Sequence, residues 1–80
     1  MVTPQQIKSA RGLLQWSEAK LAQKAGVQVS TVMRAERTWG ERMITQGNLD
    51  VIKRTLEAAG VLFIDSGEDP GVRLSGRRVD

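Results

Sequence analysis

The side chains best suited to recognising another molecule lie in residues 28–37. At about 100° per residue, a helix over this stretch turns Ser30 and Arg34 to one side. Val32 and Ala35 turn to the opposite side, where they would face a core. An arginine can donate two hydrogen bonds to the edge of a guanine, and a polar, basic helix face fits the major groove of DNA. The chemistry that these residues predict is hydrogen bonding to bases.

The residue types that catalysis and metal binding need are scarce. The chain has no histidine and no cysteine, which removes the commonest general base, the thiolate nucleophile and the usual metal ligands. The carboxylates are scattered, and there is no glycine-rich loop of the kind that cradles a phosphate. We therefore expect no enzymatic activity, no cofactor and no bound metal ion.

Two short helices joined by a tight turn are predicted around the polar face. Apolar residues recur at helical spacing along residues 18–25, and Ser17 precedes them as a candidate N-cap. Gly26 follows, where a helix end needs a residue that tolerates a left-handed conformation. A second helix then begins near Gln28. This order of helix, glycine turn and helix is the unit that places a recognition helix in the major groove.

Residues 3 to about 60 resemble the lambda-repressor-like helix-turn-helix family, also called the Cro/CI or Xre family. The matching residues are Ser17, Leu-Ala-Gln-Lys-Ala-Gly-Val at 21–27, Ser-Thr-Val at 30–32 and Glu-Arg at 36–37. The resemblance implies a mostly helical domain whose third helix reads double-stranded DNA. It also implies that Arg11, at the edge of the first helix, forms an ion pair with Glu36.

The resemblance and the helical wheel together predict which residues contact DNA. The residues expected to read base edges are Gln28, Val29, Ser30, Met33 and Arg34. Those expected to contact phosphates are Ser17, Lys20, Thr31, Arg37 and Arg42. Val29 has no hydrogen bond to give, but it can pack on the methyl group of a thymine. Glu18 stands where the family often has glutamine and would repel a phosphate, so Ser17 and Lys20 would replace that contact.

Charge is distributed unevenly along the chain. Residues 1–44 carry seven basic and three acidic side chains, a net charge of +4, whereas residues 45–80 carry five basic and six acidic ones, a net charge of −1. The basic half contains the predicted recognition unit, which suits a polyanion on one face. An ordinary solvated basic surface would have the same composition, so charge alone does not select DNA.

The flanking segments complete a domain of four helices in residues 1–60. Thr3 is a candidate N-cap, and Gln6 completes a capping box for a first helix that runs to about Leu14. Gly12 within this helix predicts that another helix packs closely against it. A fourth helix is expected over residues 45–59, followed by a glycine stop.

Residues 61–80 predict a short β-hairpin and a tail, where the commoner version of the family continues with a fifth helix. Residues 61–65 form a short run that is apolar up to Ile64 and contains β-branched and aromatic residues, Pro70-Gly71 suits a turn, and residues 72–75 alternate. One face of such a strand can cover the fourth helix, and the other would stay exposed in a monomer. We therefore expect a two-fold dimer through the hairpin. The expected interface residues are Val51, Val61, Leu62, Phe63 and Ile64.

No segment predicts a membrane or secretory destination. Eighty residues form one small domain, no apolar run is long enough to span a bilayer, and Met-Val-Thr-Pro does not open a signal peptide. The absence of cysteine fits a reducing compartment. We therefore expect a cytoplasmic protein.

Taken together, these features predict a sequence-specific regulator of transcription. It would be a repressor that binds a palindromic operator as a dimer, through its third helix in the major groove. The alternative is an antitoxin or another protein-binding module, in which residues 61–80 cover a partner protein such as a toxin. An electrophoretic shift with genomic DNA, with and without a co-expressed neighbour, discriminates between the two.

Overall fold

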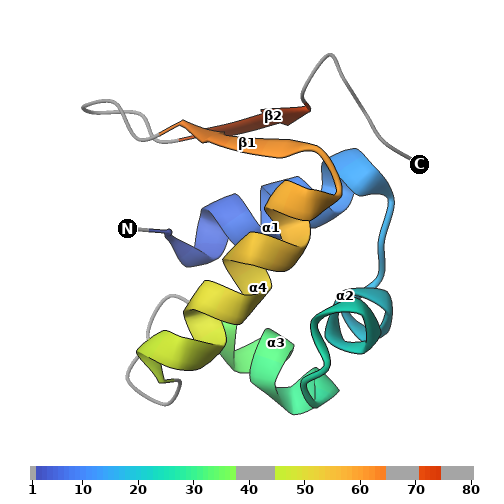
Figure 1. The fold of residues 1–80 in the computed structure, drawn as a ribbon, viewed down its shortest axis with the longest axis vertical. Coiled ribbons are helices and arrows are strands. Elements are labelled where there is room, and N and C mark those ends of the chain that lie inside the picture. Colours follow the sequence, from blue (N-terminus) through green and yellow to red (C-terminus); the bar gives the residue numbers. More distant parts are fainter. Residues whose placement is uncertain (1, 38–44, 65–70, 75–80) are drawn as a thin grey trace.

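The computed structural model describes residues 2–37, 45–64 and 71–74. The helices in these residues are α1 (Pro4–Leu14), α2 (Glu18–Ala25), α3 (Val29–Ala35) and α4 (Gln46–Ala58), and the strands are β1 (Val61–Ile64) and β2 (Gly71–Leu74). The described chain is therefore mostly helical with a small antiparallel hairpin, as the sequence predicts (Figure 1). None of these helices is both long enough and apolar enough to cross a membrane.

Side chains cap the beginnings of three helices. At α1, the Thr3 hydroxyl accepts the backbone N–H of Gln6 at 3.1 Å, and the Gln6 carboxamide oxygen accepts the backbone N–H of Thr3 at 2.9 Å. Ser17 and Thr45 cap α2 and α4 through their hydroxyl groups. Each cap satisfies backbone donors that the first helical turn leaves without a partner. The predicted capping box at α1 and the predicted cap at α2 are confirmed.

Left-handed residues end two helices and follow a third. Gly26 ends α2 with φ of 72°, and Gly60 follows α4 with φ of 105°. Both glycines were expected at helix ends, because they adopt this conformation at little cost. Gln15 ends α1 with φ of 58° and is not a glycine. Such a backbone costs about 1–2 kcal/mol in a residue with a Cβ atom, and the sequence does not predict it.

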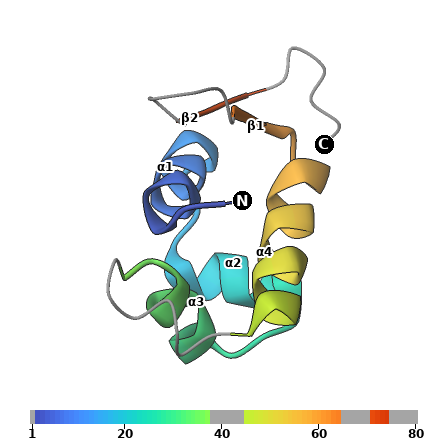
Figure 2. The same cartoon turned by 90° about the vertical axis from the view of Figure 1, so that its left-hand side faces the viewer.

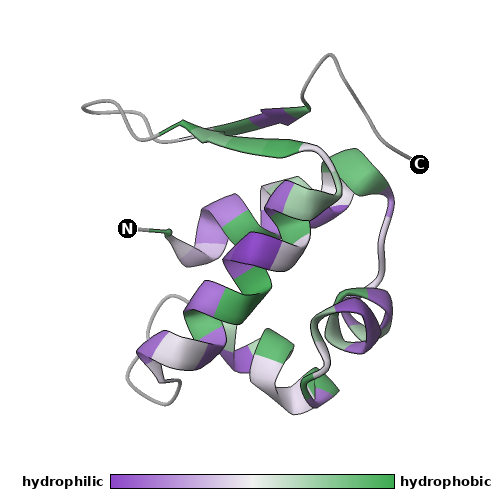
Figure 3. Cartoon of the chain, viewed as in Figure 1, coloured by the Kyte–Doolittle hydropathy of each residue, from purple (hydrophilic) through white to green (hydrophobic). Residues whose placement is uncertain are grey.

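The core lies between the four helices and the inner face of the hairpin. The buried apolar side chains are Ile7, Ala10, Leu21, Ala22, Val32, Ala35, Ile52, Leu56 and Val61. Figure 3 shows that β1 is apolar along its length, whereas apolar and polar residues alternate along the helices. Each helix therefore contributes one apolar side to the core, and the hairpin is needed to cover the remaining apolar surface.

The hairpin closes the side of the core that α1 and α4 leave open. Its strands pair antiparallel, with Val61 opposite Leu74 and Phe63 opposite Val72. β2 lies against α1 and β1 lies against α4, so the sheet extends over both helices (Figure 2). Phe63, Val72 and Leu74 all pack against the buried core. The prediction that one face of the hairpin covers α4 is confirmed, and the same face also covers α1.

The Gln6 side chain ties the hairpin to α1. It is 2% exposed, and its amide nitrogen donates to the carbonyl oxygens of Ile64 at 3.1 Å and Gly71 at 3.0 Å. Ile64 and Gly71 are the paired residues at one end of the two strands. One carboxamide therefore caps α1 through its oxygen and holds both strands through its nitrogen.

Gly12 does not have the packing role that the sequence suggests. It is exposed, and a Cβ atom placed on it would have no heavy atom within 4 Å apart from its chain neighbours and the backbone of its own helix. The expectation of a close helix contact at Gly12 is wrong, and nothing in the structure explains a glycine there.

Candidate nucleic-acid interface

The short connection between α2 and α3 fixes how the two helices pack. Residues 26–28 join them, and the backbone N–H of Val27 donates to the carbonyl oxygen of Ala22 at 3.0 Å. The two helices lie against each other, with Ala22, Val32 and Ala35 all buried. Small residues at these positions allow close helix packing. Because one side of α3 is buried in this way, its other side faces outward.

The predicted base-reading residues lie on the outward side and the first turn of α3. Gln28 and Arg34 are exposed, Val29 is 42% exposed and Met33 is 39% exposed. Gln28 is the N-cap residue of α3, yet its side chain makes no capping hydrogen bond. Its carboxamide is therefore available for other partners. Ser30 is only half-buried, so the structure brings all five residues to the surface.

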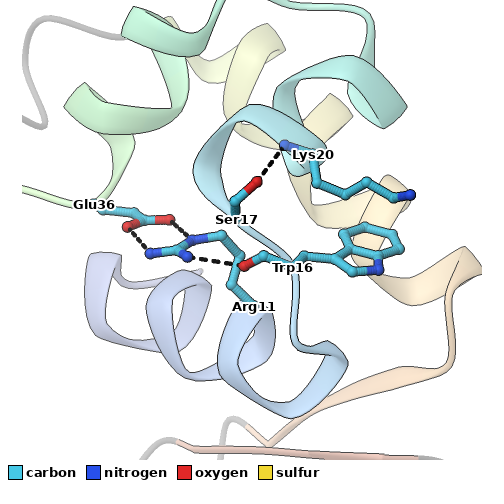
Figure 4. A network of polar contacts seen from close by, with 5 residues as sticks. All are labelled: Arg11, Trp16, Ser17, Lys20 and Glu36. Atoms are coloured by element: carbon cyan, nitrogen blue, oxygen red, sulfur yellow. Dashed lines mark hydrogen bonds and ion pairs between the residues drawn. The ribbon is translucent and has the colours of Figure 1, made fainter.

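The predicted phosphate-contacting residues differ in how exposed they are. Ser17 and Lys20 are exposed in the first turn of α2, where the Ser17 hydroxyl accepts the backbone N–H of Lys20 at 3.0 Å (Figure 4). The cap uses only the backbone N–H of Lys20, so the side-chain ammonium group takes no part in it. Arg37 is exposed just beyond α3, and Thr31 is half-buried. Arg42 lies outside the described residues.

An ion pair fixes the C-terminal end of α3 to α1. The Arg11 Nε atom lies 2.7 Å from Oε2 of Glu36, and the Arg11 Nη2 atom lies 2.9 Å from Oε1 (Figure 4). Such a two-bond contact fixes orientation as well as distance. The third contact of the guanidinium is Nη1 donating to the backbone carbonyl of Trp16 at 3.0 Å. The predicted Arg11–Glu36 pair is confirmed, and it also holds the turn before α2.

The environment of Arg11 favours its charged form. The hydrogen bond to Glu36 raises the pKa of the Arg11 guanidinium, burial opposes this rise, and the charges of Glu36 and Glu18 support it. A pKa raised in the folded state adds stability at every pH below the ordinary value and loses it only as pH rises through the raised value. Arginine ordinarily titrates far above neutral pH, so Arg11 stays charged throughout the range in which proteins function.

The expected dimer residues divide into buried and exposed groups. Val61 is 1% exposed and belongs to the core, so the expectation that it contacts a second copy is wrong. Phe63 and Ile64 are half-buried, and the Lys53 ammonium lies 5.9 Å from the centre of the Phe63 ring. Leu62 is 45% exposed on the outer face of the hairpin. Val51, on α4, is 38% exposed.

The comparisons with known proteins assign no family to this arrangement. The chain matches no protein-family model and no curated protein. The described part of the chain also holds no group of three acidic side chains that could bind a metal ion. The candidate site therefore rests on its own geometry: α3 is fixed on one side and presents polar, basic and apolar side chains on the other.

Proposed function

We propose that this protein is a sequence-specific DNA-binding regulator of the helix-turn-helix type, which represses transcription by placing α3 in the major groove of its operator. The observation that carries the proposal is the two-sided character of α3. Val32 and Ala35 are buried on one side, while Gln28 and Arg34 are exposed on the other. An exposed carboxamide and guanidinium are the groups that read adenine and guanine edges in that groove.

The surroundings of α3 support a polyanionic partner. Lys20 in the first turn of α2 and Arg37 just beyond α3 are both exposed, and positive charge at such positions could hold a phosphate backbone. The only carboxylate among residues 28–37 is that of Glu36, whose side chain is 3% exposed and already paired with Arg11. The outward face of α3 therefore presents no negative side chain to repel DNA.

Replacing Arg34 by alanine is expected to weaken binding to the protein's preferred site by about 1–3 kcal/mol and to relax its preference at one base pair. The site would first be obtained by sequencing the genomic DNA fragments that the purified protein retains. Affinity would then be measured at fixed salt for that site and for each of its single-base-pair variants.

The matched control for Arg34 is Arg54, an exposed arginine on α4. Its replacement by alanine removes the same charge and should leave the base preference unchanged. Circular dichroism should show equal helical content in both variants, because both side chains are exposed. An Arg34→Ala protein that binds the selected site as tightly as the wild type would exclude Arg34 as a base reader.

A palindromic operator would be bound by a dimer, and the outer face of the hairpin supplies its contact in this proposal. The exposed Leu62 lies opposite the exposed Arg73 on that face, while Phe63 and Val72 pack on the core. A chain ending at Gly60 would lose the buried Val61 and could not separate assembly from folding. A single substitution on the outer face is therefore the better test.

Replacing Leu62 by threonine is expected to convert a micromolar dimer into a monomer, because it removes exposed apolar surface and keeps a residue that favours strands. Sedimentation velocity at several protein concentrations measures the change. The matched control is Leu13→Gln on α1, where the leucine is 40% exposed; this variant should still dimerise. A monomeric wild type, or equal effects of the two substitutions on dimerisation, would exclude the outer face of the hairpin as the dimer contact.

A further inference from the structure

The helix α3 and the hairpin lie at opposite ends of the molecule. In two views at right angles, the hairpin is at one end and α3 at the other, with α1 between them (Figure 1, Figure 2). The longest dimension of the chain, 33 Å, runs in this direction. α3 packs on α2 and α4, whereas the hairpin packs on α1 and α4. The surface proposed to bind DNA and the surface proposed to bind a second copy are therefore far apart.

The two surfaces also face in opposite directions. Val32 and Ala35 turn the inner side of α3 to the core, and the hairpin packs its inner face on the same core. Because the core lies between these two elements, their outer sides point away from each other. The exposed Arg34 therefore faces solvent at one end of the molecule, and the exposed Leu62 faces solvent at the other.

A contact through the outer face of the hairpin fixes the shape of the dimer. In a two-fold contact, the same patch of each copy faces its equivalent on the other copy. Two copies that meet through this face are stacked hairpin to hairpin, with each α3 at the far end. The distance between the two α3 helices is then nearly twice the length of one molecule, and their outer sides point in opposite directions.

A single palindromic operator does not fit such a dimer. Its two half-sites lie on one side of a duplex and are about 34–36 Å apart, so the two recognition helices must point the same way. DNA resists bending over lengths below about 150 base pairs, so it cannot turn back within one operator to reach both ends of the dimer. One α3 can therefore bind one half-site, and the other α3 stays free for a different duplex.

We infer that the dimer bridges DNA, with one duplex at each end, or two distant segments of the same DNA molecule. The inference rests on the proposed function, because it keeps α3 as the reading helix and the outer face of the hairpin as the dimer contact. It assigns the two α3 helices to two separate operators instead of the two halves of one palindrome. A dimer bound in this way closes the DNA between its two operators into a loop.

The test measures bridging directly with the full chain. A duplex that carries a site selected from genomic fragments is attached to beads, and a second, labelled duplex with the same site is added with the protein. The wild type should retain the labelled duplex on the beads, and a labelled duplex without the site should not be retained. Leu62→Thr should lower retention to the level without protein. Leu13→Gln, the matched control on α1, should bridge as the wild type does.

The affinity for one duplex separates bridging from the reading of a palindrome. In a bridging dimer each α3 binds independently, so Leu62→Thr should change the affinity for one duplex by no more than about twofold. If both α3 helices bound one palindrome, loss of the dimer would lower that affinity by about 100-fold or more.

Three results would overturn bridging and leave DNA binding by α3 standing. They are a wild-type dimer that retains no labelled duplex, a monomeric wild type, and a Leu62→Thr protein that still retains the labelled duplex. A wild type that retains no genomic fragment at all would overturn the proposed function as well.

Discussion

Replacing Arg11 by alanine is expected to lower the free energy of unfolding by about 3–5 kcal/mol, the cost of leaving a buried charge without its partner. The Glu36 side chain is only 3% exposed, and Arg11 occupies both of its carboxylate oxygens. Glu36→Ala should cost less, because 20% of the Arg11 side chain is exposed and its guanidinium keeps the Trp16 carbonyl as an acceptor. A domain of this size has a total stability of about 4–12 kcal/mol, so either loss is a large fraction of the whole.

Urea unfolding followed by circular dichroism measures these losses. The double variant should lose less than the sum of the two single variants, because the second substitution removes the charge that the first one left unpaired. Arg34→Ala is the control, since it removes an exposed arginine and should change stability by a few tenths of a kcal/mol. Additive losses of that small size at Arg11 and Glu36 would contradict a structural role for the pair.

Replacing Gln6 by glutamate is expected to lower the free energy of unfolding by about 2–5 kcal/mol at neutral pH, although it changes a single group. Glutamate serves the capping box as well as glutamine does, so α1 keeps its cap. The hairpin, however, loses the donor that now reaches the carbonyl oxygens of Ile64 and Gly71. In its place, a buried carboxylate would face these two oxygens.

The pH dependence of this variant gives a second measurement. Burial should raise the pKa of the introduced carboxyl group, so the variant regains stability as pH falls through that raised value. The protonated form can donate one hydrogen bond, so the recovery should be partial. Thr3→Ala is the control, because it removes the capping hydroxyl and keeps the Gln6 donor. Thr3→Ala should lower the free energy of unfolding by about 1 kcal/mol at any pH. Equal losses in the two variants would show that Gln6 acts only as a cap.

Hydrogen exchange locates the effect of Gln6. In Gln6→Glu, the amides of β1 and β2 should exchange faster relative to those of α2 and α3, because the connection between α1 and the hairpin is broken. In Thr3→Ala, the faster exchange should be confined to the first turn of α1.

Most of the features that the sequence predicted have local signals. Ser17 stands directly before its helix, Gly26 and Gly60 stand at helix ends, and each of these roles involves backbone groups only a few residues away. The Arg11–Glu36 pair spans 25 residues, and it was expected from the family resemblance together with the position of both residues at the edges of apolar stripes. The position of Arg34 on the outward side of α3 follows from helical periodicity alone.

The features that the sequence did not predict depend on distant partners. The carbonyl groups that Gln6 binds are 58 and 65 residues away, so the local pattern reveals only its capping role. Val61 belongs to a run of four apolar residues, in which no alternation marks the inward face of the strand. Gln15 adopts a left-handed conformation that its residue type does not favour, and neither this position nor the next one has the glycine or asparagine that usually marks such a helix end.

The position of β2 against α1 bears on when the protein can fold during its synthesis. Val72 and Leu74 pack on a core that also contains Ile7 and Ala10, so the two ends of the described chain must meet before that core is closed. When the four helices of a nascent chain have been synthesised, β2 is still missing. The side-chain amide of Gln6 then has no strand pair to which it can donate. Contacts so far apart in sequence form slowly, and exposed apolar surface is what chaperones and proteases recognise. A chain stopped or cut before Gly71 should therefore be a substrate for degradation rather than a shorter working protein.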